Sequence, residues 1–255
     1  MLKNKGSIVK TLKMAWELYC ATLKVCFFFA VVSATIAEYF KLYALNSGVA
    51  EVLHKYMQTG TLPASLPDAQ LLAALGLFSI FVTMCVYGLL ICVGGGHIRD
   101  GKSKHGVTKK AFLALKKRFP LFLMVCILNG FLWFLASFLN IFVLWLVASF
   151  TLIVLPTVLL GNVGVWMTFR ENFRLLGGNL LYALQLGFII ILLLMIKYIV
   201  SVIFMAFVSA GSVNFGIEYV VIIFVDSLIL PFIIMVMVAA FHELNAQDDM
   251  PISHK

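Results

Sequence analysis

Six apolar stretches dominate this chain, and each is long enough to cross a lipid bilayer. A helix needs about 20 apolar residues to span roughly 30 Å of hydrocarbon. The apolar residues run continuously instead of alternating with polar ones, so each stretch is predicted to be a helix. We expect an all-α integral membrane protein that forms one domain over residues 1–255. The six transmembrane helices are expected at about residues 25–45, 69–95, 119–137, 139–160, 180–208 and 217–241.

The composition excludes an ordinary soluble fold. Hydrophobic residues make up 63% of the chain and charged residues 12%, whereas a soluble domain contains about 25% charged residues. The third and fourth stretches form one uncharged run that is too long for a single helix. Ser137 and Asn140 lie within this run and predict a tight reversal. We therefore expect the six helices to pair as three hairpins.

The basic residues are distributed unevenly between the gaps. Most of the 19 lysines and arginines precede the first stretch, lie between the second and third or the fourth and fifth, or follow the sixth. Lys41 and Lys55 lie in the other gaps, and Lys197 lies within a stretch. The positive-inside rule therefore predicts cytoplasmic N and C termini. The net charge of +8 then indicates a bilayer with anionic lipids as the partner, and no nucleic acid.

Three basic and aromatic segments precede the first, third and fifth stretches, at residues 8–24, 107–118 and 165–178. In the last of them, Trp166 and Phe173 alternate with Arg170 and Arg174 at near-helical spacing. Such segments are typical of amphipathic helices that lie flat at a membrane surface. We expect three copies of one unit, a cytoplasmic interfacial helix followed by a helical hairpin. The alternative is that any cytoplasmic loop beside a membrane is basic and aromatic.

Several basic side chains are candidates for binding anionic lipid headgroups. The first of them follow a glycine run at residues 94–96, which permits a backbone nest for phosphate oxygens. The alternative is a helix end followed by a simple turn. The candidate residues are Arg99, Lys102, Lys104, Lys109, Lys110, Lys116, Lys117, Arg118, Arg170 and Arg174.

Two opposite charges, Lys197 and Asp226, lie deep within the fifth and sixth stretches. They are at similar distances from the turn between these stretches, so two antiparallel helices place them at nearly the same depth. An ionised side chain at the bilayer centre costs at least about 2.5 to 3.5 kcal/mol, and pairing lowers this cost. The pair is predicted to be either a gate or ion-coupled site, or a fixed lock between the two helices.

Short motifs along most of the chain resemble the YciC-like bacterial inner-membrane proteins and the related membrane domain of some glycerophosphodiester phosphodiesterases. These motifs are AWELY at residues 15–19, the glycine-containing segment 88–101, AFLALKKRFP at 111–120, Leu-Pro at 155–156 and FRENFRLLGGN at 169–179. The resemblance implies a six-span inner-membrane protein without a defined reaction. The phosphodiesterase activity is not implied, because no segment is long enough for that domain.

We expect no enzyme, cofactor or metal site. Paired carboxylates, Ser/His/Asp sets and metal-ligand spacings do not share a predicted helix face. The five cysteines lack CxxC spacing and are expected to be free, buried thiols. The favoured function is a structural or regulatory membrane component that binds anionic lipid or partner proteins, including a second copy of the chain. A small transporter or channel using Lys197 and Asp226 is the alternative, and a lipid-modifying enzyme is the least favoured.

Overall fold

The computed structural model describes residues 7–48, 69–100, 107–209 and 215–248. Within these ranges the secondary structure is helical, and no strand is present. The helices are α1 (Ile8–Asn46), α3 (Ala69–Asp100), α4 (Val107–Leu139), α5 (Ile141–Phe150), α6 (Val154–Leu160), α7 (Val165–Gly177), α8 (Leu180–Ser209) and α9 (Phe215–Asp248).

The described ranges contain six helical segments that are long and apolar enough to cross a membrane, as the sequence predicts. Five of them are the single helices α1, α3, α4, α8 and α9, and the sixth is formed by α5 and α6 together. The number of spans is therefore confirmed, and the chain is a multi-pass membrane protein. Lys102 and Lys104, two candidate headgroup ligands, lie outside the described residues.

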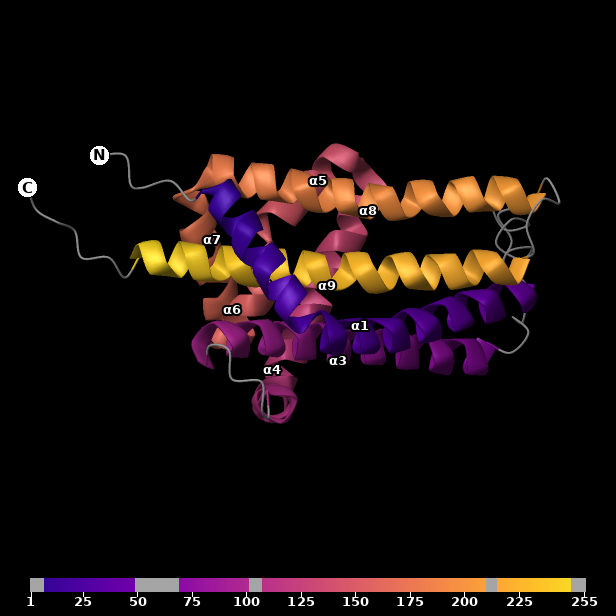
Figure 1. Cartoon of the computed structure of the whole chain (residues 1–255), viewed down its shortest axis with the longest axis horizontal. Helices are drawn as coiled ribbons and strands as arrows, with labels where there is room; N and C mark the ends of the chain where they lie inside the picture. Colours follow the sequence, from indigo (N-terminus) through magenta and orange to yellow (C-terminus); the bar gives the residue numbers. More distant parts are fainter. Residues whose placement is uncertain (1–6, 49–68, 101–106, 210–214, 249–255) are drawn as a thin grey trace, which may run out of the picture.

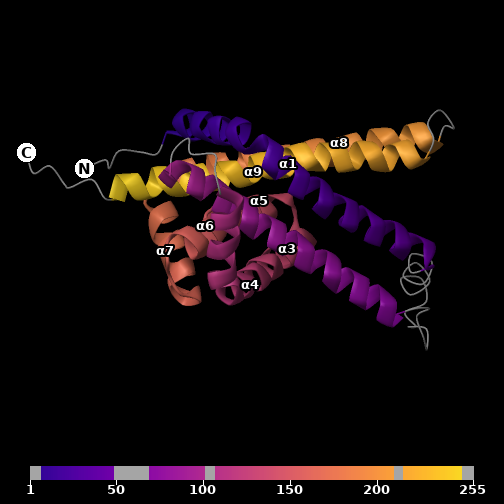
Figure 2. The ribbon, with the colours of Figure 1, turned by 60° about the horizontal axis from the view of Figure 1, so that its bottom comes forward.

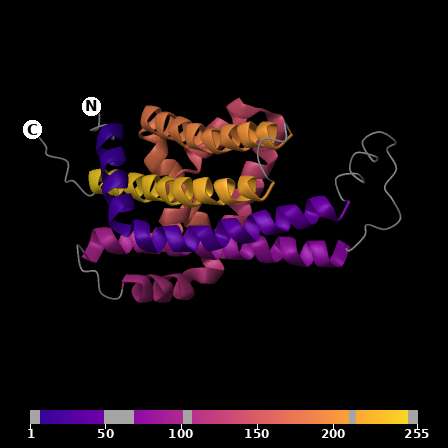
Figure 3. The same ribbon diagram turned by 45° about the vertical axis from the view of Figure 1, so that its right-hand side comes forward.

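Helix α1 is continuous through the segment at residues 8–24 and the first apolar stretch. It begins at Ser7, whose side chain accepts a hydrogen bond from the Lys10 amide, and no glycine or proline follows to end it early. The helix nevertheless changes direction, because its first part crosses the long helices at a steep angle and its second part runs along them (Figures 1 and 3). The predicted interfacial segment is therefore the first part of a longer helix.

The same difference from the prediction is found in α4, where residues 107–118 continue into the third span. Pro120 lies inside this helix, where its ring and missing N–H favour a kink without ending the helix. Only the third predicted interfacial segment forms a separate helix, α7. Its buried residues, Thr168, Asn172 and Leu175, recur at helical spacing on one face.

The fourth span is broken into two short helices, and this break is absent from the sequence prediction. Asn140 separates α4 from α5 and caps α5, because its Oδ1 accepts from the Val143 amide at 2.9 Å. A second interruption at residues 151–153 separates α5 from α6. Pro156 follows this interruption in the first turn of α6, where its missing N–H needs no partner.

Side chains of neighbouring helices satisfy the backbone around this second interruption. Asn172 of α7 donates from Nδ2 to the Phe150 carbonyl, and Arg118 of α4 donates from Nη1 to the Val158 carbonyl at 2.7 Å. Residues 151–159 are buried. Non-helical backbone at membrane depth is tolerated only where protein covers it and its polar groups are paired. Residues 151–159, and not the exposed start of α5, therefore form the covered centre of the fold.

The remaining helices surround this centre. Helix α1 packs against α9 and α3, α8 packs against both α5 and α9, and α4 packs against α3, α5 and α6. Figure 2 shows α5, α6 and α7 clustered beside one half of the long α8 and α9 pair. The buried core accordingly combines residues of α3, α6, α8 and α9, with Leu90, Val154, Leu186 and Ile234 fully covered. Both ends of the described chain lie at the end of the molecule that holds α6 and α7 (Figure 1).

Candidate functional site

A cavity of about 280 Å³ lies at the end of the molecule where the basic residues gather. The C-terminal turns of α3, the first turns of α4, the end of α6 and the last turns of α9 form its walls. Arg99, Lys110 and His242 provide its basic groups, and Leu159, Leu160, Phe241 and small residues provide its apolar surface. The cavity therefore combines a cationic edge with an apolar wall.

The structure brings two of the ten predicted headgroup ligands, Arg99 and Lys110, to this cavity. Three further lysines of the set are exposed on the first turns of α4, and Arg170 is exposed on α7. These lysines are Lys109, Lys116 and Lys117. Exposed aromatic side chains accompany them on the same helices, with Phe112 57% and Trp166 81% accessible. Arg99 and Lys110 therefore lie at the cavity, whereas the exposed lysines and Arg170 add basic side chains to the surfaces of α4 and α7.

Arg118 and Arg174 of the predicted set have named partners inside the protein. Arg118 donates to the Val158 carbonyl, so its guanidinium holds α4 against α6. Arg174 pairs with Glu171 one turn earlier in α7. Two aromatic residues of the first part of α1 also contact α9, because the rings of the exposed Trp16 and the buried Tyr19 lie 6.1 and 5.6 Å from the ring of Phe232.

Lys197 of α8 and Asp226 of α9 form an ion pair, with 2.7 Å between Nζ and Oδ2. The Lys197 side chain is 41% exposed, whereas that of Asp226 is 15% exposed. The lysine therefore reaches a largely covered carboxylate from the outer side of the helix pair. The structure places the two charges together, and their role as a gate or a lock stays a prediction.

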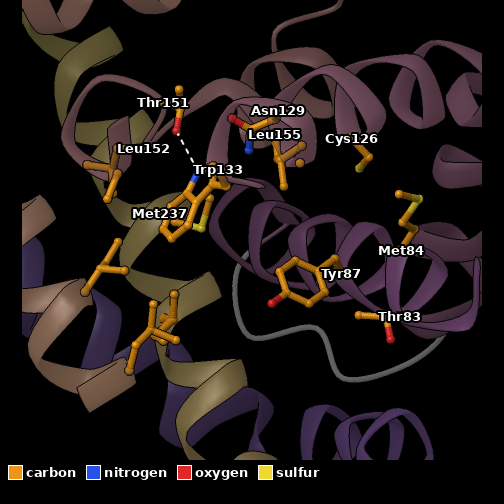
Figure 4. Close-up of a pocket in the computed structure, with 15 residues that line it drawn as sticks. Thr83, Met84, Tyr87, Cys126, Asn129, Trp133, Thr151, Leu152, Leu155 and Met237 are labelled. Atoms are coloured by element: carbon orange, nitrogen blue, oxygen red, sulfur yellow. Dashed lines mark hydrogen bonds between the residues drawn. The ribbon is translucent and has the colours of Figure 1, made fainter. Parts of the chain in front are cut away.

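A larger cavity of about 420 Å³ lies between the helices, and Tyr87 of α3 is one of the residues that line it. Helices α3, α4, α5, α6, α8 and α9 and the turn at residues 151–153 all contribute to its lining. Figure 4 shows Asn129 and Trp133 on one side and Tyr87 on another, with a hydrogen bond between Trp133 and Thr151. This bond joins Nε1 to Oγ1 at 3.1 Å. The sequence analysis identified none of these residues.

Sequence analysis also missed a polar connection at the basic end of the molecule. Lys10 of α1 pairs with Glu243 of α9 at 2.7 Å, and the Glu243 side chain is only 5% exposed. One residue later, the Thr11 hydroxyl lies 2.8 Å from the buried Tyr182 hydroxyl of α8. These two contacts join the first turn of α1 to the start of α8 and the end of α9. The residues are far apart in the sequence, so no local pattern predicts them.

The cysteines show no site. All five are free thiols, and Cys26, Cys92 and Cys126 are buried. Among the described residues, no cluster of three or more His, Cys, Asp or Glu side chains has the geometry to hold a metal ion. No family model, curated protein or solved structure matches this chain. Function has to be inferred from the two cavities, the ion pair and the charged surface.

Proposed function

We propose that this chain is a non-enzymatic inner-membrane protein, structural or regulatory, that binds anionic lipid at its basic end. The observation that carries this proposal is the cavity between Arg99, Lys110, Phe241 and His242. An anionic phospholipid has a phosphate group and alkyl chains in one molecule. The basic edge suits the phosphate, and the wall formed by Leu159 and Phe241 suits the first part of a chain.

The chemistry of the basic edge supports binding of a phosphate group. A guanidinium group recognises phosphate through two parallel N–H donors, and a lysine ammonium contributes a point charge. Val107, Lys110 and Ala111 belong to the first turns of α4 and line the cavity. The open backbone N–H groups and positive dipole end of a helix also favour an anion. Arg99, Lys110 and the start of α4 thus offer three sources of positive potential.

The basic helix segments extend the proposed contact with lipid. The first part of α1 crosses the long helices (Figure 3), as a helix lying along a membrane surface would. Trp166 and Arg170 of α7 and the exposed lysines of α4 provide the aromatic and basic side chains that favour the interface. We infer that these three segments lie on the cytoplasmic face and that the spans between them form three hairpins.

The proposal includes the resemblance to YciC-like inner-membrane proteins and a protein partner. Large apolar side chains such as Phe188 and Met195 of α8 are exposed, which suits contact either with lipid or with another membrane protein. A second copy of this chain is one such partner. Contact with lipid and contact with a protein partner are both compatible with cytoplasmic chain termini, which the distribution of basic residues predicts.

A small transporter or channel is the second candidate function. The observation that favours it is the Lys197–Asp226 ion pair, which lies within two spans. Ionisable residues inside membrane helices often mark ion or substrate pathways. A transporter requires this pair to change partners during its cycle, whereas a lipid-binding scaffold requires only that it hold α8 to α9.

Lipid binding by the purified protein tests the first proposal. Phosphatidylglycerol and phosphatidylcholine are titrated separately into delipidated protein, and bound lipid is counted by native mass spectrometry. We expect phosphatidylglycerol to bind more tightly to the wild type. The double variant Arg99→Gln/Lys110→Gln should lose this preference, by about fivefold for each charge removed.

Filling the cavity provides an independent arm of this test. A Cβ at Gly96 or at Gly177 meets no atom within 4 Å, but only Gly96 lines the basic cavity. Gly96→Leu should weaken phosphatidylglycerol binding, and the matched control Gly177→Leu should not. Equal affinity of the wild type for both lipids, or unchanged binding in the filled and neutralised variants, would disprove the proposal.

A further inference from the structure

The larger cavity is separate from the basic one and lies within the membrane-spanning part of the bundle. Its volume of about 420 Å³ falls in the range of about 300 to 1,000 Å³ that small-molecule sites occupy. Gly130 of α4 lines it, is exposed, and has no atom within 4 Å of an added Cβ. The cavity is therefore open beside Gly130, where a molecule can enter from the surroundings of the bundle.

The lining is mainly apolar. Leu152, Leu155, Ile190, Ile233 and Met237 provide much of it. No charged side chain is among the described residues that line the cavity. The neighbouring charges of Lys197 and Asp226 are paired with each other at 2.7 Å. An ionised ligand in this position would have no opposite charge available, so the expected occupant is uncharged and largely apolar.

One polar atom in the lining lacks a partner. Asn129 Oδ1 is buried and accepts no hydrogen bond within the described structure. The Trp133 indole and the Thr151 hydroxyl, by contrast, are bonded to each other. An unpaired amide oxygen away from water costs free energy, and a ligand that supplies a donor removes this cost.

We propose that this cavity binds an uncharged lipid with an alkyl chain and a free hydroxyl group, whose O–H donates to Asn129 Oδ1. The alkyl chain lies against Leu155, Ile190 and Met237, and the Tyr87 hydroxyl is a second polar group on the cavity wall. A long-chain alcohol, a monoacylglycerol or a diacylglycerol has this chemistry. The site differs from the basic cavity in requiring no charge on the ligand.

Photoaffinity labelling with a matched pair of probes tests this inference. One probe is hexadecanol with a diazirine in its chain, and the other is the same diazirine alkane without the hydroxyl. Both are applied to the full chain in lipid nanodiscs, and the labelled peptides are identified by mass spectrometry. We expect the alcohol to label peptides of α4, α6 and α9 that line the cavity, and to do so more strongly than the alkane.

Two cavity variants and one control separate the possible outcomes. Asn129→Leu should reduce labelling by the alcohol roughly two- to tenfold, since one hydrogen bond is lost, and should leave labelling by the alkane unchanged. Gly130→Leu should reduce labelling by both probes, because a Cβ there meets no atom within 4 Å and the longer side chain would occupy the opening. Gly177→Leu lies outside the cavity and should label like the wild type.

Thermal unfolding of the same variants gives a second readout. The alcohol should raise the melting temperature of the wild type and of Gly177→Leu, and should have little effect on Asn129→Leu and Gly130→Leu. Equal labelling by both probes would assign the cavity to ordinary acyl chains and would overturn the inference. Alcohol labelling that does not change in Asn129→Leu, or that maps outside the cavity, would also overturn it.

Discussion

A single unpaired charge is costly in this protein because the surrounding spans are so apolar. Lys197 and Asp226 satisfy each other across the α8–α9 contact, with their charged atoms 2.7 Å apart. Each charge alone would cost at least about 2.5 to 3.5 kcal/mol at the centre of a bilayer. The pair therefore makes two costly residues compatible with insertion, whatever further role it has.

Lys197→Met and Asp226→Leu should each lower the folded yield and the stability of the protein, because each leaves one charge unpaired. The double variant should recover both properties, since paired charges are often replaceable by apolar residues of similar volume. The measurement is unfolding in mixed detergent micelles, followed for the wild type, the two single variants and the double variant.

Flux into reconstituted vesicles distinguishes a lock from a gate. A double variant that folds normally but abolishes an ion or lipid flux shown by the wild type would establish the transporter function. Recovery of both the stability and the flux in the double variant would support a fixed lock between α8 and α9. A double variant no more stable than either single variant would contradict the expected free-energy cost of leaving one charge unpaired.

The sequence could place Lys197 opposite Asp226 because few residues separate their two apolar stretches. Depth along each helix then follows from the residue count alone. Lys10 and Glu243 could not be paired in this way, since they lie at opposite ends of the chain and meet only in the packed bundle. Asn129 gave no recognisable signal either, because its importance comes from a missing partner in three dimensions.

At the scale of single helices, close packing between two neighbours depends on individual glycines. Gly187 of α8 lies so near α5 that an added Cβ would be 2.0 Å from Ser149 Oγ and 2.8 Å from Ser149 Cα. A backbone atom cannot move aside as a side-chain tip can, so the two helices would have to separate. Small residues permit this kind of approach between membrane helices.

Gly187→Ala should therefore destabilise the protein by about 1 to 3 kcal/mol, the usual range for overpacking. Gly130→Ala is the matched control, because the same substitution in α4 meets no atom within 4 Å. Alanine is the better helix former by about 1 kcal/mol, so the control should be neutral or more stable. Unfolding in detergent measures both, and equal stabilities of the two variants would refute the close contact.

Helix boundaries were predictable where a polar residue breaks an apolar run, and not elsewhere. Asn140 is such a residue, and the structure uses it to cap α5. The interruption at residues 151–153 lies in a mainly apolar run and is supported by Asn172 of another helix, so the run itself contains no strong signal for it. Likewise, the polar segment at residues 8–24 indicated a separate helix, but no residue there ends α1.

The molecule as a whole has one polar end and one long apolar body. The start of α1 and the end of α9 meet at the polar end, where Lys10 pairs with Glu243. An even number of spans also brings both ends of a chain to the same side of a membrane. The distribution of lysines and arginines predicts that this side is the cytoplasm.

Cysteine labelling tests this orientation. In a variant with its five cysteines replaced by alanine, Lys13→Cys, Ala246→Cys and Asn46→Cys each introduce one exposed thiol. A membrane-impermeant maleimide added to intact spheroplasts should label only Asn46→Cys. The other two should react in inverted vesicles, and all three after detergent addition. Labelling of Lys13→Cys or Ala246→Cys in intact spheroplasts would reverse the proposed topology.

The broken fourth span has a consequence for how this protein is made. The Phe150 carbonyl receives its hydrogen bond from Asn172, which leaves the ribosome 22 residues later. Until then the α5–α6 segment carries an unpaired backbone group that lipid cannot satisfy. The insertion machinery, or the helices already made, must therefore shelter this segment during translation. A chain truncated between Leu160 and Val165 would present the segment to quality-control proteases, whereas one extended beyond Gly177 would be able to close its core.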